Sequence, residues 1–410
     1  MKKSLYSVLI IILITISTFL VLSGCSSSPK QFDAKADFET LVSQAKGTTV
    51  SFYGWGGDDQ LNKWLDTVLA STLKDKYDIT LKRVPMDIDQ ILSKLSGEKQ
   101  AGKQDGSIDL IWINGENFYS AKENGFLYGP FTQKLPNFPK YIDENATEIR
   151  YDFGYPIEGY EAPYNKAQMV LINDSAITPE TPKNTAELLE YAKKYEGKIT
   201  YPALPDFTGS AFVRNIICDI VGYEQIADLE ADKETVKQAI WPAIEYLREL
   251  NPYLWNAGKT FPATSAQVQN MFADGELVMD MSYGPYSVAN LISNGTYRET
   301  ARAFLLEKGT IGNTNYIAIA QNSPNKAGAL VAVNEILSVE IQASKFSELK
   351  SLPVLDNNKL STAEKELFAK VDIGKGTIPQ DELLAKRIPE IRADLIPLIE
   401  EIWLEEVVGK

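Results

Sequence analysis

Aromatic and acidic side chains recur at short intervals in several polar turns of this 410-residue sequence. Residues 151–164 are the clearest case, and residues 282–286 are similar. The face of an aromatic ring attracts cations, and a carboxylate adds charge-assisted hydrogen bonds. Recognition of a small, partly flat organic cation is therefore the chemistry that these residues favour. A neutral carbohydrate, which also uses aromatic stacking and carboxylates, is the alternative that the sequence leaves open.

Paired carboxylates could also act on a glycosidic bond, which needs two of them about 5–10 Å apart. Glu158 with Glu161 or with Asp280 are the candidates. The sequence has no histidine, which excludes Ser-His-Asp and Cys-His catalysis and the usual zinc sites. We therefore predict a binding protein with no catalytic residues, metal site or cofactor. A carboxylate-dependent glycoside-active enzyme is the less favoured alternative.

Net charge bears on the class of partner, and the two cysteines bear on thiol chemistry. The formal net charge of −14 makes nucleic acid an unsuitable partner. The two cysteines are Cys25 and Cys218. Cys218 lies on an apolar stripe of a predicted helix over residues 213–220, which favours a buried, inert thiol over a nucleophile.

The start of the chain has the pattern of an export signal. Lys2 and Lys3 precede an apolar run over residues 8–22, and Leu-Ser-Gly-Cys follows, ending at Cys25. That tetrapeptide is similar to the bacterial lipobox, in which the cysteine is lipidated. We expect residues 1–24 to be a lipoprotein signal peptide and residues 25–45 a tether and lead-in. The protein would then be lipid-anchored to the cell membrane through Cys25, facing the extracellular or periplasmic side; an uncleaved anchor helix is the alternative.

A scaffold for the aromatic turns is predicted by alternating strands and helices. Buried-strand patterns at 50–53, 79–84 and 108–113 alternate with amphipathic helical patterns at 60–77 and 87–101. Such an order is typical of a doubly wound α/β sheet with right-handed crossovers. The length of the chain suggests two domains.

Three loops follow the predicted strands, over residues 54–59, 85–87 and 114–118. Because parallel strands have their carboxyl ends at one edge, these loops should converge on a ligand crevice. The glycine-rich loop around Trp55 lacks the spacing of a dinucleotide or phosphate loop, so we interpret it as a tight turn that offers Trp55 to the crevice. Asp58 or Asp59 is expected to cap the helix that follows. A core position for Trp112 is an equally open interpretation.

The second half of the chain repeats this organisation with less regular spacing. Residues 205–210 form a polar turn before a predicted helix at 211–221, in which Thr208 or Ser210 could cap the helix or hold a ligand. A predicted strand at 277–281 runs into the aromatic turn that contains Tyr283. Predicted strands at 303–306 and 317–320 return to the first domain, and the chain then becomes mostly helical, ending in a helix over residues 383–408.

The whole chain resembles an extracellular solute-binding protein of a bacterial ABC importer. Within that superfamily, residues 53–57, 109–118 and 153–164 resemble the YnjB-like branch, which is related to thiamine-, polyamine- and iron-type binding proteins. The resemblance implies a two-lobed, type II periplasmic-binding-protein-like α/β fold. Each lobe would be a mostly parallel sheet flanked by helices, with the ligand cleft between the lobes.

The resemblance also implies which residues form each lobe, how the protein works and which residues contact the ligand. We expect residues 46–158 with 300–345 to form the first lobe, and residues 159–299 with 346–410 the second. The protein would close on a solute, dock on an ABC importer permease and its ATPase, and release the solute. Its expected ligand-contacting residues lie in the crossover and at strand ends: Trp55, Gly56, Trp112, Asn114, Glu116, Asn117, Tyr155, Glu158, Tyr160, Phe207, Ser210, Asp280 and Tyr283.

Overall fold

The computed structural model describes residues 32–409, so the expected signal peptide and Cys25 lie outside the described residues. Two larger sheets and one hairpin organise this part of the chain. The 7-stranded sheet contains β1 (Thr49–Gly54), β2 (Thr80–Pro85), β3 (Leu110–Ile113), β4 (Leu127–Tyr128), β7 (Glu161–Gln168), β11 (Thr310–Ala320) and β12 (Arg387–Pro389). The 3-stranded sheet contains β8 (Val170–Asp174), β9 (Met279–Ser282) and β10 (Ala301–Phe304), and the hairpin contains β5 (Tyr151–Asp152) and β6 (Tyr155–Pro156).

Helices connect and cover these strands. Before β7 they are α2 (Phe38–Ala45), α3 (Asp59–Trp64), η1 (Leu65–Leu69), α4 (Ala70–Tyr77), α5 (Ile88–Gln100), α6 (Gly115–Glu123), η2 (Thr132–Lys134), α7 (Asn137–Tyr141) and α8 (Thr147–Arg150). Between β8 and β11 they are α9 (Thr185–Lys194), α10 (Phe207–Ile220), η3 (Tyr223–Gln225), α11 (Lys233–Leu250), η4 (Asn251–Tyr253), η5 (Trp255–Gly258), α12 (Ser265–Ala273) and α13 (Ser287–Ser293). After β11 they are α14 (Lys326–Ile336), α15 (Val339–Leu349), η6 (Asn357–Lys359), α16 (Thr362–Ala369), α17 (Gln380–Ala385), η7 (Ala393–Leu395) and α18 (Ile396–Glu406).

Lobe 1, the part packed on the larger sheet, has the predicted doubly wound beginning. β1 lies between β2 and β3 and pairs with both in parallel. β11 then runs antiparallel to β3 and to β7, so the sheet is mixed at this side. The predicted convergence of the three loops is confirmed, because parallel β1, β2 and β3 end at one edge of the sheet.

Lobe 2, the part packed on the smaller sheet, differs from the expected parallel arrangement. β8 pairs antiparallel with β9 on one side and with β10 on the other. The physical reason is that β8 follows β7 directly and runs away from lobe 1, whereas β9 and β10 run in the opposite direction. β9 and β10 are therefore parallel to each other, with α13 as the crossover between them.

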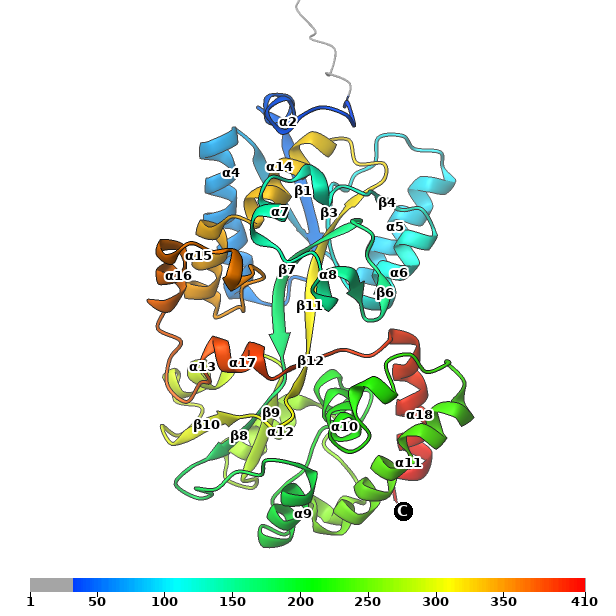
Figure 1. Cartoon of the computed structure of the whole chain (residues 1–410), viewed down its shortest axis with the longest axis vertical. Helices are drawn as coiled ribbons and strands as arrows, with labels where there is room; N and C mark the ends of the chain where they lie inside the picture. The colour runs from blue at the N-terminus through cyan, green and yellow to red at the C-terminus, as the bar shows by residue number, and fades with distance from the viewer. Residues whose placement is uncertain (1–31, 410) are drawn as a thin grey trace, which may run out of the picture. The chain divides into compact units, whose positions relative to one another are not determined.

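The sheets divide the chain differently from the expected lobe boundaries in three places. β7 pairs with β11 in the larger sheet, and β10 belongs to the smaller one. α16 packs on α15, which contacts α3 of lobe 1, whereas α18 packs on α11 of lobe 2. The chain thus passes between the lobes after β7, between β10 and β11, and after α16. Figure 1 shows β7 and β11 side by side where they connect the two lobes.

The predicted terminal helix over residues 383–408 is wrong. This stretch forms the end of α17, strand β12, η7 and helix α18. Pro389 lacks an N–H, and a residue before proline is disfavoured in a helix, so the helical pattern is interrupted there. β12 pairs in parallel with the first residues of β11 and adds a third strand to the connection between the lobes.

The core of lobe 2 contains Cys218, which is 2% exposed. The prediction of a buried thiol is confirmed. Burial raises the pKa of Cys218 to about 12, so the reactive thiolate form is suppressed at neutral pH. No helix formed by residues 32–409 combines the length and the apolar character needed to cross a membrane.

Candidate functional site

The carboxyl edge of the lobe 1 sheet is closely packed around the glycine-rich loop. The Met86 N–H donates a hydrogen bond to the Gly54 carbonyl oxygen at 2.9 Å, which joins the loops after β1 and β2. A Cβ on Gly56 would lie 2.5 Å from the Cβ of Pro85, so only glycine allows this approach. As predicted, Asp58 caps the next helix by accepting hydrogen bonds from backbone N–H groups.

Trp55 stands at this edge as an exposed aromatic side chain. It is 54% exposed, and its ring centroid lies 6.3 Å from that of Trp112 in a tilted arrangement. Trp112 is half-buried and packs edge-on against Tyr164, with 6.1 Å between ring centroids. Trp112 therefore packs against the buried Tyr164 on one side and against the exposed Trp55 on another.

The loop after β3 leads into α6. The Asn114 side-chain amide donates to Oδ1 of Asn315 on β11 at 2.9 Å, which ties the loop to the strand that connects the lobes. Gly115 has φ of +59° and donates its N–H to the Asp152 carboxylate. Glu116 is exposed in the first turn of α6, and Asn117 is half-buried. Residues 114–117 thus lie at the predicted edge, although one N–H group at the start of α6 is already used within the protein.

Lobe 2 presents a second pair of aromatic rings. Phe207 is 49% exposed, and its ring meets Tyr283 edge to face at 4.7 Å. Phe207 begins α10, which Asp206 caps by accepting from the N–H groups of Thr208 and Gly209. The predicted cap at Thr208 or Ser210 is therefore wrong: the helix begins at Phe207, earlier than predicted, so Asp206 occupies the N-cap position and Thr208 and Ser210 lie within the helix.

Tyr283 is held in place by a buried ion pair. Its hydroxyl donates to Glu390 Oε1 at 2.8 Å. Arg214 binds the same carboxylate with two groups, Nε at 3.1 Å and Nη2 at 2.8 Å. The Arg214 and Glu390 side chains are 1% and 2% exposed. The pair links α10 to the segment after β12, and so connects the lobe 2 wall to the third connection between the lobes.

Sequence reasoning missed both members of this pair. Arg214 lies in the predicted helix around Cys218, and Glu390 lay within the predicted terminal helix. The signal that could have revealed Glu390 is Pro389, which marks a break in the helix and an extended segment.

Two expected contact residues lie in the interior. Ser210 is 2% exposed; its hydroxyl donates to Glu400 and accepts from Arg214, each at 2.6 Å. Asp280 is 1% exposed within the smaller sheet and accepts a hydrogen bond from the Tyr297 hydroxyl. Their interior positions correct the expectation that they face a ligand. Position at a strand end or helix start did not suffice, because neighbouring segments cover both side chains.

The buried Asp280 makes stability depend on pH. Burial raises the pKa of its carboxyl from 3.8 to about 7, despite the hydrogen bond from Tyr297. Because the native state retains this proton while the unfolded state loses it, stability should fall as pH rises from about 4 to about 7. At 1.36 kcal/mol per unit, Asp280→Asn should gain on the order of 4 kcal/mol relative to wild type over that range. Urea unfolding of both proteins at pH 4.5 and 7.5 measures this, and a constant difference would contradict it.

Tyr155, Glu158 and Tyr160 form a separate group beside α6. The Tyr155 ring stacks on Tyr119 at 4.1 Å. Glu158 is exposed but pairs with Lys122 at 2.7 Å, and Lys122 also lies 5.4 Å from the Tyr160 ring centroid. Lys122 is in the last turn of α6, about 10 Å along the helix from residues 115–117. Glu158 and Tyr160 are therefore not brought together with Trp55 and Asn114.

The carboxylate pairs considered for glycoside chemistry are not assembled. Glu161 is 1% exposed, and its two oxygens have no hydrogen-bond partner. Asp280 is equally buried in the other sheet. Neither could flank a substrate bond with Glu158 in this structure. Within residues 32–409, no cluster of three or more acidic or cysteine side chains is arranged to hold a metal ion.

Comparison with known proteins places the chain in a family. The family described as bacterial extracellular solute-binding protein matches residues 69–369. Protein YnjB of Escherichia coli K12 is 33% identical over 373 residues, which cover 90% of this chain and 93% of YnjB.

Solved structures share the same fold. An ABC transporter protein from Clostridium perfringens superposes with a TM-score of 0.60 at 20% identity, covering 87% of this chain and 97% of that one. PotD, a spermidine/putrescine substrate-binding protein from Streptococcus pneumoniae, gives 0.61 at 13% identity, covering 87% and 98%. The expected two-lobed α/β fold is confirmed by these relatives. The chain belongs to the family of bacterial extracellular solute-binding proteins.

Proposed function

We propose that the protein captures a small cationic organic solute between its two lobes and delivers it to the importer permease. The observation that carries this proposal is a pair of exposed aromatic rings, Trp55 of lobe 1 and Phe207 of lobe 2. Trp55 directly follows β1, and Phe207 is the first residue of α10. Each ring packs against a second aromatic side chain, Trp112 for Trp55 and Tyr283 for Phe207. Large exposed aromatic side chains supported in this way are typical of sites that bind a partner.

The charge of the solute is inferred from the side chains near these rings. Glu116 is exposed at the lobe 1 edge, and the whole chain carries a formal net charge of −14. A cation over an aromatic face gains about 0.5–2 kcal/mol, and more when both are desolvated. The relative PotD is described as a polyamine-binding protein, but at 13% identity it shares the fold alone. A carbohydrate, which stacks on the same rings without needing a carboxylate, is the competing ligand.

The mechanism follows from the connections between the lobes. A solute that touches both walls stabilises the closed arrangement by its additional contacts, and β7, β11 and β12 supply the connecting strands about which the lobes move. The closed form would then dock on the permease and open to release the solute.

The test is to identify small molecules that co-purify with the protein by mass spectrometry, followed by titration with each one. A panel of thiamine, spermidine and a disaccharide of matched size provides reference ligands. Binding of a cation, weakened by raised salt, would support the proposal. If the disaccharide binds and neither cation competes with it, the assignment of a cationic solute is overturned and the solute-binding role remains.

We also propose that Cys25 carries the lipid that anchors the protein to the membrane. The lipobox-like Leu-Ser-Gly-Cys sequence supports this, and each buried CH₂ of the acyl chains would contribute about 0.8 kcal/mol. Cys25→Ala should abolish incorporation of labelled palmitate and leave an unprocessed precursor. The matched control Cys218→Ala should be labelled like wild type. Persistent acyl label on Cys25→Ala would exclude this residue as the anchor.

A further inference from the structure

A cavity of about 380 Å³ lies beside the strands that connect the lobes. It is lined by residues of β11 and β12, by α8 and the β5–β6 hairpin of lobe 1, and by η3 and the residues after it in lobe 2. Its volume is within the range of small-molecule sites, about 300–1,000 Å³. Trp55, Trp112, Phe207 and Tyr283 do not line it, so this hinge cavity is distinct from the aromatic site proposed above.

Three polar side chains that line the hinge cavity are buried and incompletely hydrogen-bonded. Asp152 Oδ1, Asn313 Oδ1 and Arg387 Nε each lack a partner. Asp152 and Asn313 are 1% and 6% exposed, and the side chain of Arg387 is 7% exposed. Buried polar atoms are nearly always paired in native proteins, and an unpaired group costs about 1–3 kcal/mol. Two acceptors and one donor beside one cavity therefore indicate a missing polar partner.

The arginines of the cavity have their own carboxylates. Arg387 lies 3.6 Å from Glu148 and donates from Nη2 to Thr314 Oγ1 at 3.2 Å. Arg392 is bound by both oxygens of Asp394. Glu148 also pairs with Lys166 at 3.1 Å. The Nε–H of Arg387 is left without an acceptor.

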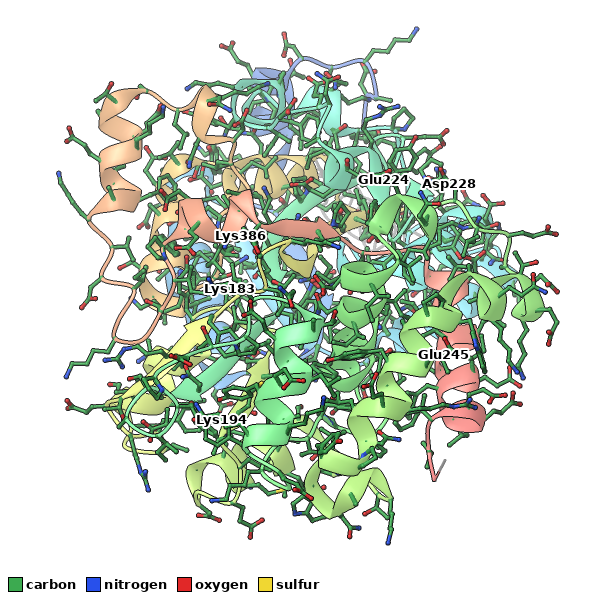
Figure 2. All side chains as sticks on the ribbon, turned by 60° about the horizontal axis from the view of Figure 1, so that its bottom comes forward. Lys183, Lys194, Glu224, Asp228, Glu245 and Lys386 are labelled. Atoms are coloured by element: carbon green, nitrogen blue, oxygen red, sulfur yellow. The ribbon has the colours of Figure 1, made fainter. Side chains whose placement is uncertain are left out.

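The negative charge of the cavity is in surplus. Glu224 and Asp228 are exposed lining residues four positions apart in the chain, and no described cation forms an ion pair with either. Figure 2 shows the two side chains close together on the segment after α10, with Glu245 well apart from them on α11. Burial also raises the pKa of Asp152 well above its usual value, despite the hydrogen bond from the Gly115 N–H, and no ion pair with a described cation compensates its charge. A positively charged occupant would supply that compensation.

Aromatic rings provide the remaining walls. Tyr151, Phe153, Tyr223 and Tyr316 all line the cavity. An ammonium group gains energy over such ring faces, and its three N–H donors match carboxylate and amide acceptors. A solute with both an ammonium group and an oxygen acceptor would also satisfy the free Nε–H of Arg387.

We propose that the hinge cavity is a binding site for a small amine that also carries a hydroxyl or carbonyl oxygen. Its ammonium group donates to Asp152 Oδ1 and Asn313 Oδ1, its oxygen accepts from Arg387 Nε, and Glu224 and Asp228 attract it to the entrance. Since Asp152 belongs to lobe 1 and Glu224 to lobe 2, the occupant contacts both lobes.

The test uses 4-aminobutan-1-ol as the probe and 1,4-butanediol as its neutral match, each titrated by calorimetry and by ligand-observed NMR. The aminoalcohol should bind wild type and the diol should not. Asn313→Leu should weaken binding about tenfold or more, since one charge-assisted hydrogen bond is lost. Glu224→Gln/Asp228→Asn, both exposed changes, should weaken it several-fold without altering the melting temperature.

The matched control is Glu245→Gln, an exposed acid of lobe 2 whose loss should leave binding unchanged. The proposal is overturned if the aminoalcohol fails to bind wild type at millimolar concentration, or if it binds both cavity variants like wild type. Binding weakened by Trp55→Ala and not by the cavity variants would place the amine at the aromatic site and reject the hinge cavity alone. If Trp55→Ala and Phe207→Ala bind the natural solute like wild type while the aminoalcohol still binds the hinge cavity, the aromatic-site proposal fails and the hinge-cavity proposal stands.

Discussion

Trp55→Ala and Phe207→Ala should each weaken binding of the natural solute about tenfold or more, because loss of 1.4 kcal/mol is already a factor of ten. Both rings are about half exposed, at 54% and 49%, and would be covered by a solute held between the lobes. Since both rings would contact the same solute, their effects need not add. The double variant should lose at least as much affinity as either single variant, measured by calorimetric titration.

The control for this experiment is Leu404→Ala. Leu404 is 62% exposed on α18, so this substitution also removes an exposed apolar side chain from lobe 2. Its affinity should equal that of wild type. Melting temperatures of all variants establish that folding is intact. Wild-type affinity in both aromatic variants would mean that the solute is bound elsewhere.

Arg214→Met should destabilise lobe 2 by about 3–5 kcal/mol, because it leaves the Glu390 carboxylate buried without its cation. Adding Glu390→Gln to that variant should restore most of the loss: the charge disappears, and the glutamine oxygen still accepts from the Tyr283 hydroxyl. Chemical denaturation of the three proteins measures both effects. A single variant as stable as wild type would show that the buried pair is not held as described.

An exposed ion pair provides the contrast. Lys233 lies 2.8 Å from Glu401 and from Glu405 at the surface of lobe 2. Lys233→Met should change stability by about 1 kcal/mol or less, because solvent screens exposed pairs. Equal losses for Lys233→Met and Arg214→Met would exclude burial as the cause.

Features that depend on local pattern could be predicted from the amino-acid sequence. Apolar runs separated by amphipathic helices predicted β1, β2 and β3, and the parallel arrangement then required their loops to meet at one edge. The glycine-rich loop, the Asp58 cap and the burial of Cys218 follow from residue type and from position on a helix or turn. Periodicity is encoded within a few residues, so it can be inferred without knowing what lies opposite.

Which polar side chains are available to a ligand depends on the packing of distant segments. Ser210 and Asp280 stand at predicted junctions, yet segments from elsewhere bury them. Arg214 and Glu390 are 176 residues apart and meet because β12 joins the connection between the lobes. Burial and pairing of a charged group depend on all the segments that surround it, and local sequence does not contain that information. The aromatic edge could therefore be predicted from the chain, whereas the ion pair behind Tyr283 and the hinge cavity required the folded structure.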